Sequence, residues 1–305
     1  MIYEIIKPFI RIALSFFCRK IYIHHRNNLQ LKGPILIVAN HPNSFLDAII
    51  IGAFFKNPIH FLARGDAFKK NHHRFFLRLL NMIPIYRLSE GKENLYLNEY
   101  AFNQSQKILE KGGIVLIFIE GICLLTNQLQ PFKKGAARIA LDYQGNTALK
   151  ILPIGIAYDQ FNAWAKTVQV IIGEPIESNS LFPFQERAKN MNYFNSHIKQ
   201  ALEPLIIPPK PENIQPNKWI HFIASIGFYL HQPPFKIINQ LVKAKTKNTV
   251  FYDSVLFGIL FIIYPLFLLI IGILLNFLFG IWGFIILCFI VIAARTIVLC
   301  KNPIK

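Results

Sequence analysis

The sequence is poor in charged residues and in cysteine. Charged side chains make up 16% of the 305 residues, while hydrophobic residues make up 53%. Ordinary soluble domains carry roughly 25% charged residues. So large an apolar content excludes an intrinsically disordered chain. The 4 cysteines are scattered along the chain, which excludes a domain stapled by disulfides and indicates a reduced, cytoplasmic environment.

Acidic residues are also scarce. Asp and Glu number 16 against 33 Lys and Arg, so the formal net charge is +17. A charge of this sign favours an anionic partner, either a membrane surface or a nucleic acid. The lysines are dispersed, and no RNP-like, zinc or helix-turn-helix signature accompanies them. We therefore expect membrane lipids as partners and no nucleic acid.

Several enzyme signatures are missing as well. The sequence contains no GxSxG, Walker A, GxGxxG, HExxH or paired CxxC motif. These motifs mark α/β-hydrolases, P-loop enzymes, dinucleotide-binding folds, zinc proteases and zinc or redox sites. We accordingly expect neither a metal ion nor a bound cofactor.

The hydrophobic excess is concentrated near the C-terminal end. Residues 255–294 form a run of 40 without a charge, against about 20 for one helix across a bilayer. We predict a transmembrane hairpin within residues 253–305, with spans at about 255–275 and 278–297. Basic residues flank both ends, so the positive-inside rule places both on the cytoplasmic side. The alternative is a buried hairpin in a globular core. The Ile-, Asn-, Lys- and Phe-rich composition is typical of an AT-rich bacterial gene, which makes the membrane a bacterial inner membrane.

Residues 1–29 show a different pattern, that of an amphipathic helix. Apolar residues recur there at helical spacing: Ile2, Ile5, Ile6, Phe9, Ile12, Ala13, Phe16 and Phe17. We predict a helix in the membrane interface, with Arg11, Arg19 and Lys20 available to lipid phosphates. The alternative is an ordinary helix packed on its own domain.

Between these ends, strand and helix patterns alternate. The predicted strands are 34–39, 58–62, 114–119, 151–158 and 167–172, and the predicted helices are 44–54, 74–80, 94–110, 136–142 and 186–202. This alternation predicts an α/β layered domain over residues 30–205. Four prolines between 208 and 216 then indicate a stiff linker. We assign residues 206–252 to this linker and to juxtamembrane helices.

One dense polar cluster follows the first of these strands, at residues 39–47. It contains His41 and, about one helical turn further on, Asp47. The end of a strand that leads into a helix is where α/β sheets bind ligands. A carboxylate there would fix the imidazole tautomer and make an oriented general base. The alternative is a capping box, in which Ser44 and Asp47 only satisfy backbone donors.

Four motifs in order resemble those of the glycerolipid acyltransferase family, the lysophosphatidic acid acyltransferases of phospholipid synthesis. The matching segments are Asn40-His41 with Asp47, residues 81–87, Phe118-Ile119-Glu120-Gly121 and Leu152-Pro153-Ile154, with a further similar segment at 131–137. The resemblance covers residues 30–205. It implies a mixed sheet flanked by helices, preceded by the interfacial helix and followed by the transmembrane hairpin.

The sequence also departs from the family pattern. Five residues separate His41 from Asp47, where the family usually has four, so the turn before the helix must absorb one extra residue. Ile122-Cys123 stands where the family commonly has Thr-Arg, which removes a cation often assigned to phosphate. The second motif lacks its usual Gly and Phe. These differences predict an altered acceptor pocket or a weakened enzyme, on the same fold.

The resemblance implies a membrane-bound O-acyltransferase that uses acyl-coenzyme A or acyl carrier protein as donor and a lyso-lipid as acceptor. His41 would be the general base and Asp47 its orienting acid. Arg87 would bind the acceptor phosphate, because a guanidinium pairs bidentately with phosphate oxygens. The remaining assignments are Glu120 to an acceptor hydroxyl or to orienting Arg87, Gly121 to close backbone approach, and Arg64 and Lys133 to a basic rim. The alternative function is a catalytically inactive lipid-binding or scaffold relative.

Overall fold

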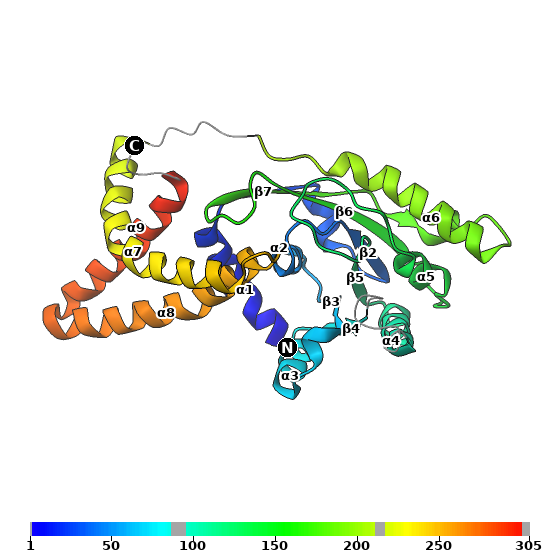
Figure 1. The fold of residues 1–305 in the computed structure, drawn as a ribbon, viewed down its shortest axis with the longest axis horizontal. Coiled ribbons are helices and arrows are strands. Elements are labelled where there is room, and N and C mark those ends of the chain that lie inside the picture. The colour runs from blue at the N-terminus through cyan, green and yellow to red at the C-terminus, as the bar shows by residue number, and fades with distance from the viewer. Residues whose placement is uncertain (1, 87–95, 211–216, 301–305) are drawn as a thin grey trace.

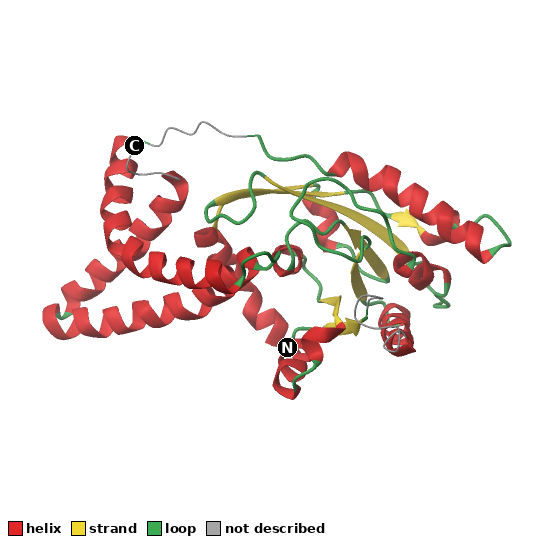
Figure 2. Cartoon of the chain, in the orientation of Figure 1, coloured by secondary structure: helices red, strands yellow, loops and turns green. Residues whose placement is uncertain are grey.

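A computed structural model describes residues 2–86, 96–210 and 217–300. Within them one mixed sheet runs through the molecule in the order β1-β7-β6-β2-β5-β3-β4, and β8 pairs with β6 (Figures 1 and 2). The strands are β1 (Cys18–His24), β2 (Ile35–Ala39), β3 (Ile59–Arg64), β4 (Met82–Ile85), β5 (Ile114–Phe118), β6 (Lys150–Tyr158), β7 (Lys166–Ile172) and β8 (Ile176–Glu177). The predicted mixed sheet is confirmed.

The central strands are parallel. In register, Ile37 of β2 lies beside Leu116 of β5 and Leu152 of β6. β7 and β8 run antiparallel to β6. Parallel β2, β5 and β6 therefore end at the same edge of the sheet, where the loops that follow β2 and β5 meet.

Helices cover both faces of the sheet, as expected for strands that are apolar throughout. One core lies between the sheet and α1 (Ile2–Phe17), α2 (Phe45–Phe54), α7 (Lys218–Lys245) and α8 (Tyr252–Phe279). The other lies between the sheet and α4 (Asn98–Glu110), α5 (Gly135–Leu141) and α6 (Arg187–Leu202). β2 shows the alternation: Ile35 and Ile37 face the first core, and Leu36 and Val38 the second.

β1 is an element that the sequence analysis does not predict. It pairs in parallel with β7, with Ile21 beside Val168 and Ile23 beside Val170. The sheet therefore begins at Cys18, within the segment 1–29 that the sequence assigns to a membrane-associated helix. The strand is the edge of the sheet, and its half-buried residues do not show a clean alternation of apolar and polar side chains.

α1 is amphipathic as predicted, but its cationic side faces the protein. Lys7 donates to the carbonyl of Lys56 at 3.1 Å, and Arg11 donates to the carbonyl of Ala53. These carbonyls lie at the C-terminal end of α2, where backbone oxygens lack helical partners and a positive charge is favoured. Arg11 is nevertheless exposed, so its availability to lipid phosphates stays a prediction. The apolar residues Ile5, Phe9 and Ile12 are each more than half exposed.

The C-terminal part is a set of long helices that extend away from α5 and α6 (Figure 1). α7 bends along its length (Figure 1) and contains the pair Pro233-Pro234; proline is the usual cause of a sharp helix kink. α8 and α9 (Ile281–Cys300) have mean hydropathies of 2.9 and 2.6 over their most apolar stretches. Both are long and apolar enough to cross a membrane. The tight turn between them is at Gly280, which has a φ of 55°.

Candidate active site

The polar cluster lies where β2, β5 and β6 end. Asn40, the residue after β2, exchanges two hydrogen bonds with the backbone of Ile156 in β6, both 2.8 Å long. The Asn40 side chain thus pairs with the backbone of β6 as a strand backbone would, one residue beyond the end of β2. This fixes the start of the loop that carries His41.

His41 and Asp47 are in contact despite the extra residue between them. The His41 Nδ1 atom lies 2.9 Å from Asp47 Oδ2. The Asp47 side chain is fully buried, whereas His41 remains 14% exposed. A carboxylate oxygen can only accept a hydrogen bond, so Nδ1 must be the donor. In the neutral ring Nδ1 therefore carries the proton and Nε2 keeps its lone pair. In this tautomer Nε2 is the ring nitrogen that can take a proton.

Two further donors hold Asp47 in place. The Asn43 N–H donates to Oδ2 at 2.7 Å, and the Tyr158 hydroxyl donates to Oδ1 at 2.7 Å. Burial, followed by the nearby Asp47 charge, raises the pKa of Tyr158 well above 10, so the hydroxyl stays a donor. The sequence analysis did not identify Tyr158. Its only signal is a polar atom at the end of a predicted buried strand.

The extra residue is absorbed in a turn at Ser44. Leu46 donates to the Asn43 carbonyl at 3.2 Å, which closes a four-residue turn just before α2. Ser44 has a φ of 53° and a ψ of −138°, close to the first central position of a type II′ turn, which glycine normally occupies. The turn brings Asp47 back under His41, so the backbone rather than the side chains accommodates the longer spacing.

We predict that a Ser44→Gly substitution stabilises the protein by about 1 kcal/mol and leaves the His41–Asp47 contact intact. A non-glycine residue in this region is strained by roughly 1–3 kcal/mol, part of which the greater freedom of glycine in the unfolded chain offsets. Thermal unfolding in detergent measures the change. Ser44→Ala, which keeps the β-carbon, is the matched control and should gain nothing. A Ser44→Gly variant less stable than Ser44→Ala would contradict the strain argument.

Two of the departures from the family pattern meet at this turn. The Ser44 N–H donates to the Sγ atom of Cys123 at 3.0 Å. The half-buried Cys123 thus contacts the inserted turn from the loop after β5. The sequence analysis treats the spacing change and the Ile122-Cys123 replacement as separate losses, but in the structure one contact joins them.

Phe118 and Glu120, from the end of β5, support His41 on its other sides. The rings of Phe118 and His41 stack with centroids 3.8 Å apart and planes 10° apart. Glu120 is buried, and its two oxygens accept the backbone N–H groups of His41 and Gln130, each at 3.1 Å. Burial raises the pKa of Glu120, although these bonds act in the opposite direction. The two bonds tie the loop after β5 to the loop after β2.

Part of the chain matches a known protein family and its relatives. Residues 20–157 match the family model described as Acyltransferase. A probable 1-acyl-sn-glycerol-3-phosphate acyltransferase of Mycoplasma genitalium is 27% identical over 199 residues, which cover 64% of this chain and 65% of that protein. The 1-acyl-sn-glycerol-3-phosphate acyltransferase of Pseudomonas aeruginosa is 28% identical over 156 residues, which cover 49% and 57% of the two chains. The matches thus span less than two thirds of these relatives.

A solved structure shares the fold. It is the 1-acyl-sn-glycerophosphate (LPA) acyltransferase PlsC from Thermotoga maritima, with a TM-score of 0.50 and 20% sequence identity. The match covers 68% of this chain and 81% of that chain. The architecture of the acyltransferase domain is therefore that of a PlsC-like fold.

Not all of the predicted binding residues of the acyltransferase domain come together in the described residues. Arg87 lies outside them. Arg64 at the end of β3 forms an ion pair with Asp66, and its guanidinium lies 5.7 Å from the Phe251 ring. Asp66 thus pairs with the guanidinium that the sequence analysis assigns to a basic rim. The assignment of Arg64 to substrate stays a prediction.

Gly121 and Lys133 are neighbours. Gly121 has a φ of 63°, and a β-carbon there would lie 2.8 Å from Cγ of Lys133. A glycine is thus required both by the backbone conformation and by the Lys133 side chain that crosses it. The exposed Lys133 lies within the loop held by Glu120. The roles of Gly121, Lys133 and Glu120 in substrate binding stay predictions.

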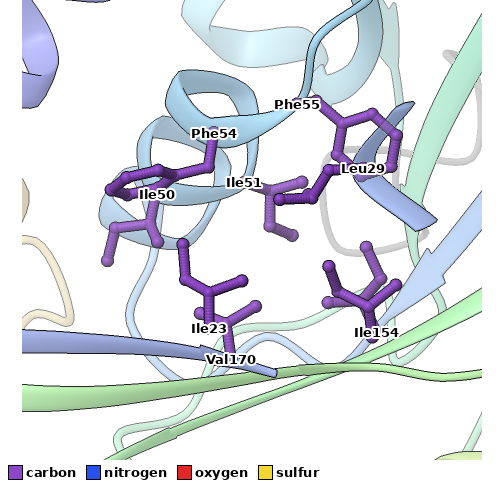
Figure 3. Close-up of a pocket in the computed structure, with 9 residues that line it drawn as sticks. Ile23, Leu29, Ile50, Ile51, Phe54, Phe55, Ile154 and Val170 are labelled. Carbon is purple, nitrogen blue, oxygen red and sulfur yellow. The ribbon is translucent and has the colours of Figure 1, made fainter. Parts of the chain in front are cut away.

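A small cavity in the acyltransferase domain lies elsewhere, between α2 and the sheet. Ile50, Ile51 and Phe54 line it from α2, and Ile23, Ile154 and Val170 line it from the strands (Figure 3). All of its lining side chains are apolar. Because its lining side chains contain no group that could transfer a proton, this cavity is not the candidate active site.

Proposed function

We propose that this protein is a membrane-bound O-acyltransferase that moves a fatty acyl chain from a thioester donor to a hydroxyl of a lysophosphatidate-like acceptor. The observation that carries the proposal is the contact between Nδ1 of the partly exposed His41 and the buried Asp47 carboxylate. The acyltransferase family match and the names of the similar proteins supply the reaction class. The donor would be acyl-coenzyme A or acyl carrier protein.

The proposed mechanism needs one proton acceptor and no covalent acyl-enzyme. His41 Nε2 takes the proton of the acceptor hydroxyl as its oxygen attacks the thioester carbonyl. The buried Asp47 stabilises the imidazolium that forms, and Tyr158 and Asn43 keep that carboxylate in place. When the tetrahedral intermediate collapses, the carbon–sulfur bond breaks, the new ester forms and the thiolate takes the proton from His41. Holding both reactants in line would supply much of the acceleration.

Membrane association follows from the helices outside the sheet. α8 and α9 would form the transmembrane hairpin of residues 253–305, with residues 206–252 at the membrane surface. The exposed Ile5, Phe9 and Ile12 of α1 would lie in the interface. The positive net charge favours anionic lipids, an acceptor phosphate and a polyanionic donor. With both ends basic, the acyltransferase domain would face the cytoplasm, at a bacterial inner membrane.

The alternative, an inactive lipid-binding relative, rests on the longer His41–Asp47 spacing. The turn at Ser44 preserves the contact, which removes that argument for inactivity. The loss of the Thr-Arg pair beside Glu120 bears on acceptor binding rather than on the proton acceptor. An active enzyme with an altered acceptor pocket is therefore the reading that we favour.

The test uses membranes that contain the full chain or its His41→Ala variant. Each receives labelled acyl-coenzyme A or acyl carrier protein with lysophosphatidate, glycerol 3-phosphate or lyso-aminolipids, and the products are analysed by mass spectrometry. We expect wild type to acylate lysophosphatidate, and the His41→Ala variant to make no such product. If lysophosphatidate binds but no donor and acceptor give a His41-dependent product, the inactive relative is the correct reading.

A further inference from the structure

The first turn of the long apolar helix α8 reaches the turn that carries the proposed catalytic residues. Asp253 is fully buried. Its Oδ2 atom accepts from Asn43 Nδ2 at 2.9 Å, from the Asn162 N–H at 3.1 Å and from Lys166 Nζ. Three separate parts of the acyltransferase domain thus converge on one carboxylate oxygen from α8.

A second contact joins the same two elements. The Ser254 hydroxyl oxygen accepts the Leu46 N–H of α2 at 3.2 Å. Leu46 is in the first turn of α2, and its N–H is shared between the Ser254 hydroxyl oxygen and the Asn43 carbonyl, each at 3.2 Å. α8 therefore helps to cap the helix on which Asp47 lies.

Asn43 links Asp253 to the proposed catalytic pair. Its backbone N–H donates to Asp47 Oδ2, while its side chain donates to Asp253 Oδ2. One residue is thus held at both its backbone and its side chain. A shift of Asp253 would move the donor that fixes the Asp47 carboxylate, and with it the ring of His41.

We propose that Asp253 and Ser254 are positioning residues of the acyltransferase, and that α8 completes the active site by holding the 43–47 turn. This inference rests on the function proposed above. Neither residue takes part in the proposed proton transfer. They act through Asn43 and Leu46.

Energetics favour positioning over stability as the reason for this polar arrangement. A buried ion pair such as Lys166–Asp253 contributes little net stability, since apolar residues of similar volume often do as well or better. The other oxygen of Asp253 and the Oδ1 atom of Asn43 are buried and accept no hydrogen bond from the described residues. What the arrangement provides is a fixed geometry for the turn at Asn43.

The test compares Asn43→Ala and Ser254→Ala in the full chain, reconstituted in lipid nanodiscs. Both variants leave the Lys166–Asp253 ion pair in place, but Asn43→Ala removes one donor to the buried Asp253 carboxylate and should lower the melting temperature by a few degrees, so activity is measured well below it. We expect kcat to fall by about 10- to 100-fold with little change in KM, as for a misaligned catalytic group. Ser254→Thr keeps the hydroxyl and should restore activity. Asn57→Ala, which loses a bond to the Leu31 carbonyl, and Ser180→Ala are matched controls that should behave as wild type.

A second readout does not depend on turnover. In protein labelled with ¹⁵N-histidine, the Nδ1 proton of His41 reports its hydrogen bond to Asp47, and His41→Ala assigns the signal. We expect this signal to move in both Asn43→Ala and Ser254→Ala and to return in Ser254→Thr. If it moves but wild type acylates no acceptor, the positioning role stands and the proposed function fails. If wild type is active and both variants match it in kcat and in this signal, the inference is overturned.

Discussion

An Asp47→Asn variant is expected to keep its fold and to lose about 100- to 1,000-fold of its acyl-transfer rate. The amide can turn its oxygen toward His41 Nδ1 and the Asn43 N–H, and its NH₂ toward the Tyr158 oxygen, which can accept. The reactive tautomer is then preserved. What disappears is the negative charge that stabilises the imidazolium while the hydroxyl proton is on His41.

The measurement is kcat with lysophosphatidate, beside a melting curve for each variant. Asp142→Asn, at the end of α5 and paired with Arg187 on the surface, is the control and should retain full rate. Adding Tyr158→Phe to Asp47→Asn should lower the rate further, because the amide NH₂ then loses its acceptor. A rate for Asp47→Asn within a few-fold of wild type would show that Asp47 only caps α2.

A Lys166→Met substitution is expected to destabilise the protein by about 3–5 kcal/mol. Lys166 and Asp253 are both fully buried, and their side chains form an ion pair. Burial lowers the pKa of Lys166, and the Asp253 charge acts against that shift. Removing the cation leaves a carboxylate without its counter-charge among apolar side chains, which is the costliest change we predict.

The double variant Lys166→Met/Asp253→Asn separates the charge from the packing. With both charges gone, most of the lost stability should return, because an amide at 253 can still accept from Asn43 and Asn162. The free energies of unfolding of wild type, Lys166→Met, Asp253→Asn and the double variant, measured in the same detergent, give the coupling energy between the two sites. Lys107→Met, an exposed site on α4, is the control. Two effects that simply add would mean that the pair is not coupled.

The regular part of the fold could be predicted from the sequence because its strands are short and apolar. The expected strand 114–119 corresponds to β5 at Ile114–Phe118, and the expected helix 186–202 to α6 at Arg187–Leu202. β1 could not be found in this way, because Cys18–His24 contains Arg19, Lys20 and His24 and continues directly from α1. Only its pairing with β7 makes it a strand.

The candidate site, too, could be predicted only in part from the sequence. A strand end, a histidine and a carboxylate one turn later are visible in the sequence, and they indicate the His41–Asp47 pair. The orientation of α1 is not visible, since an amphipathic pattern does not say which face meets the protein. Tyr158, Lys166 and Asp253 lie 111, 119 and 206 residues from Asp47 in this numbering, so their place around the turn depends on tertiary structure that local patterns do not contain.

The buried carboxylate at the start of α8 also sets how the enzyme meets its substrate. The Asp253 side chain is buried against the acyltransferase domain, and uncharged residues that would enter the bilayer follow it closely in the sequence. In the proposed arrangement the 43–47 turn therefore stays beside the lipid headgroups through every cycle. A lyso-lipid could reach it by lateral diffusion without leaving the bilayer. The effective substrate concentration for such an enzyme is the mole fraction of acceptor in the leaflet, and not its amount per volume of solution.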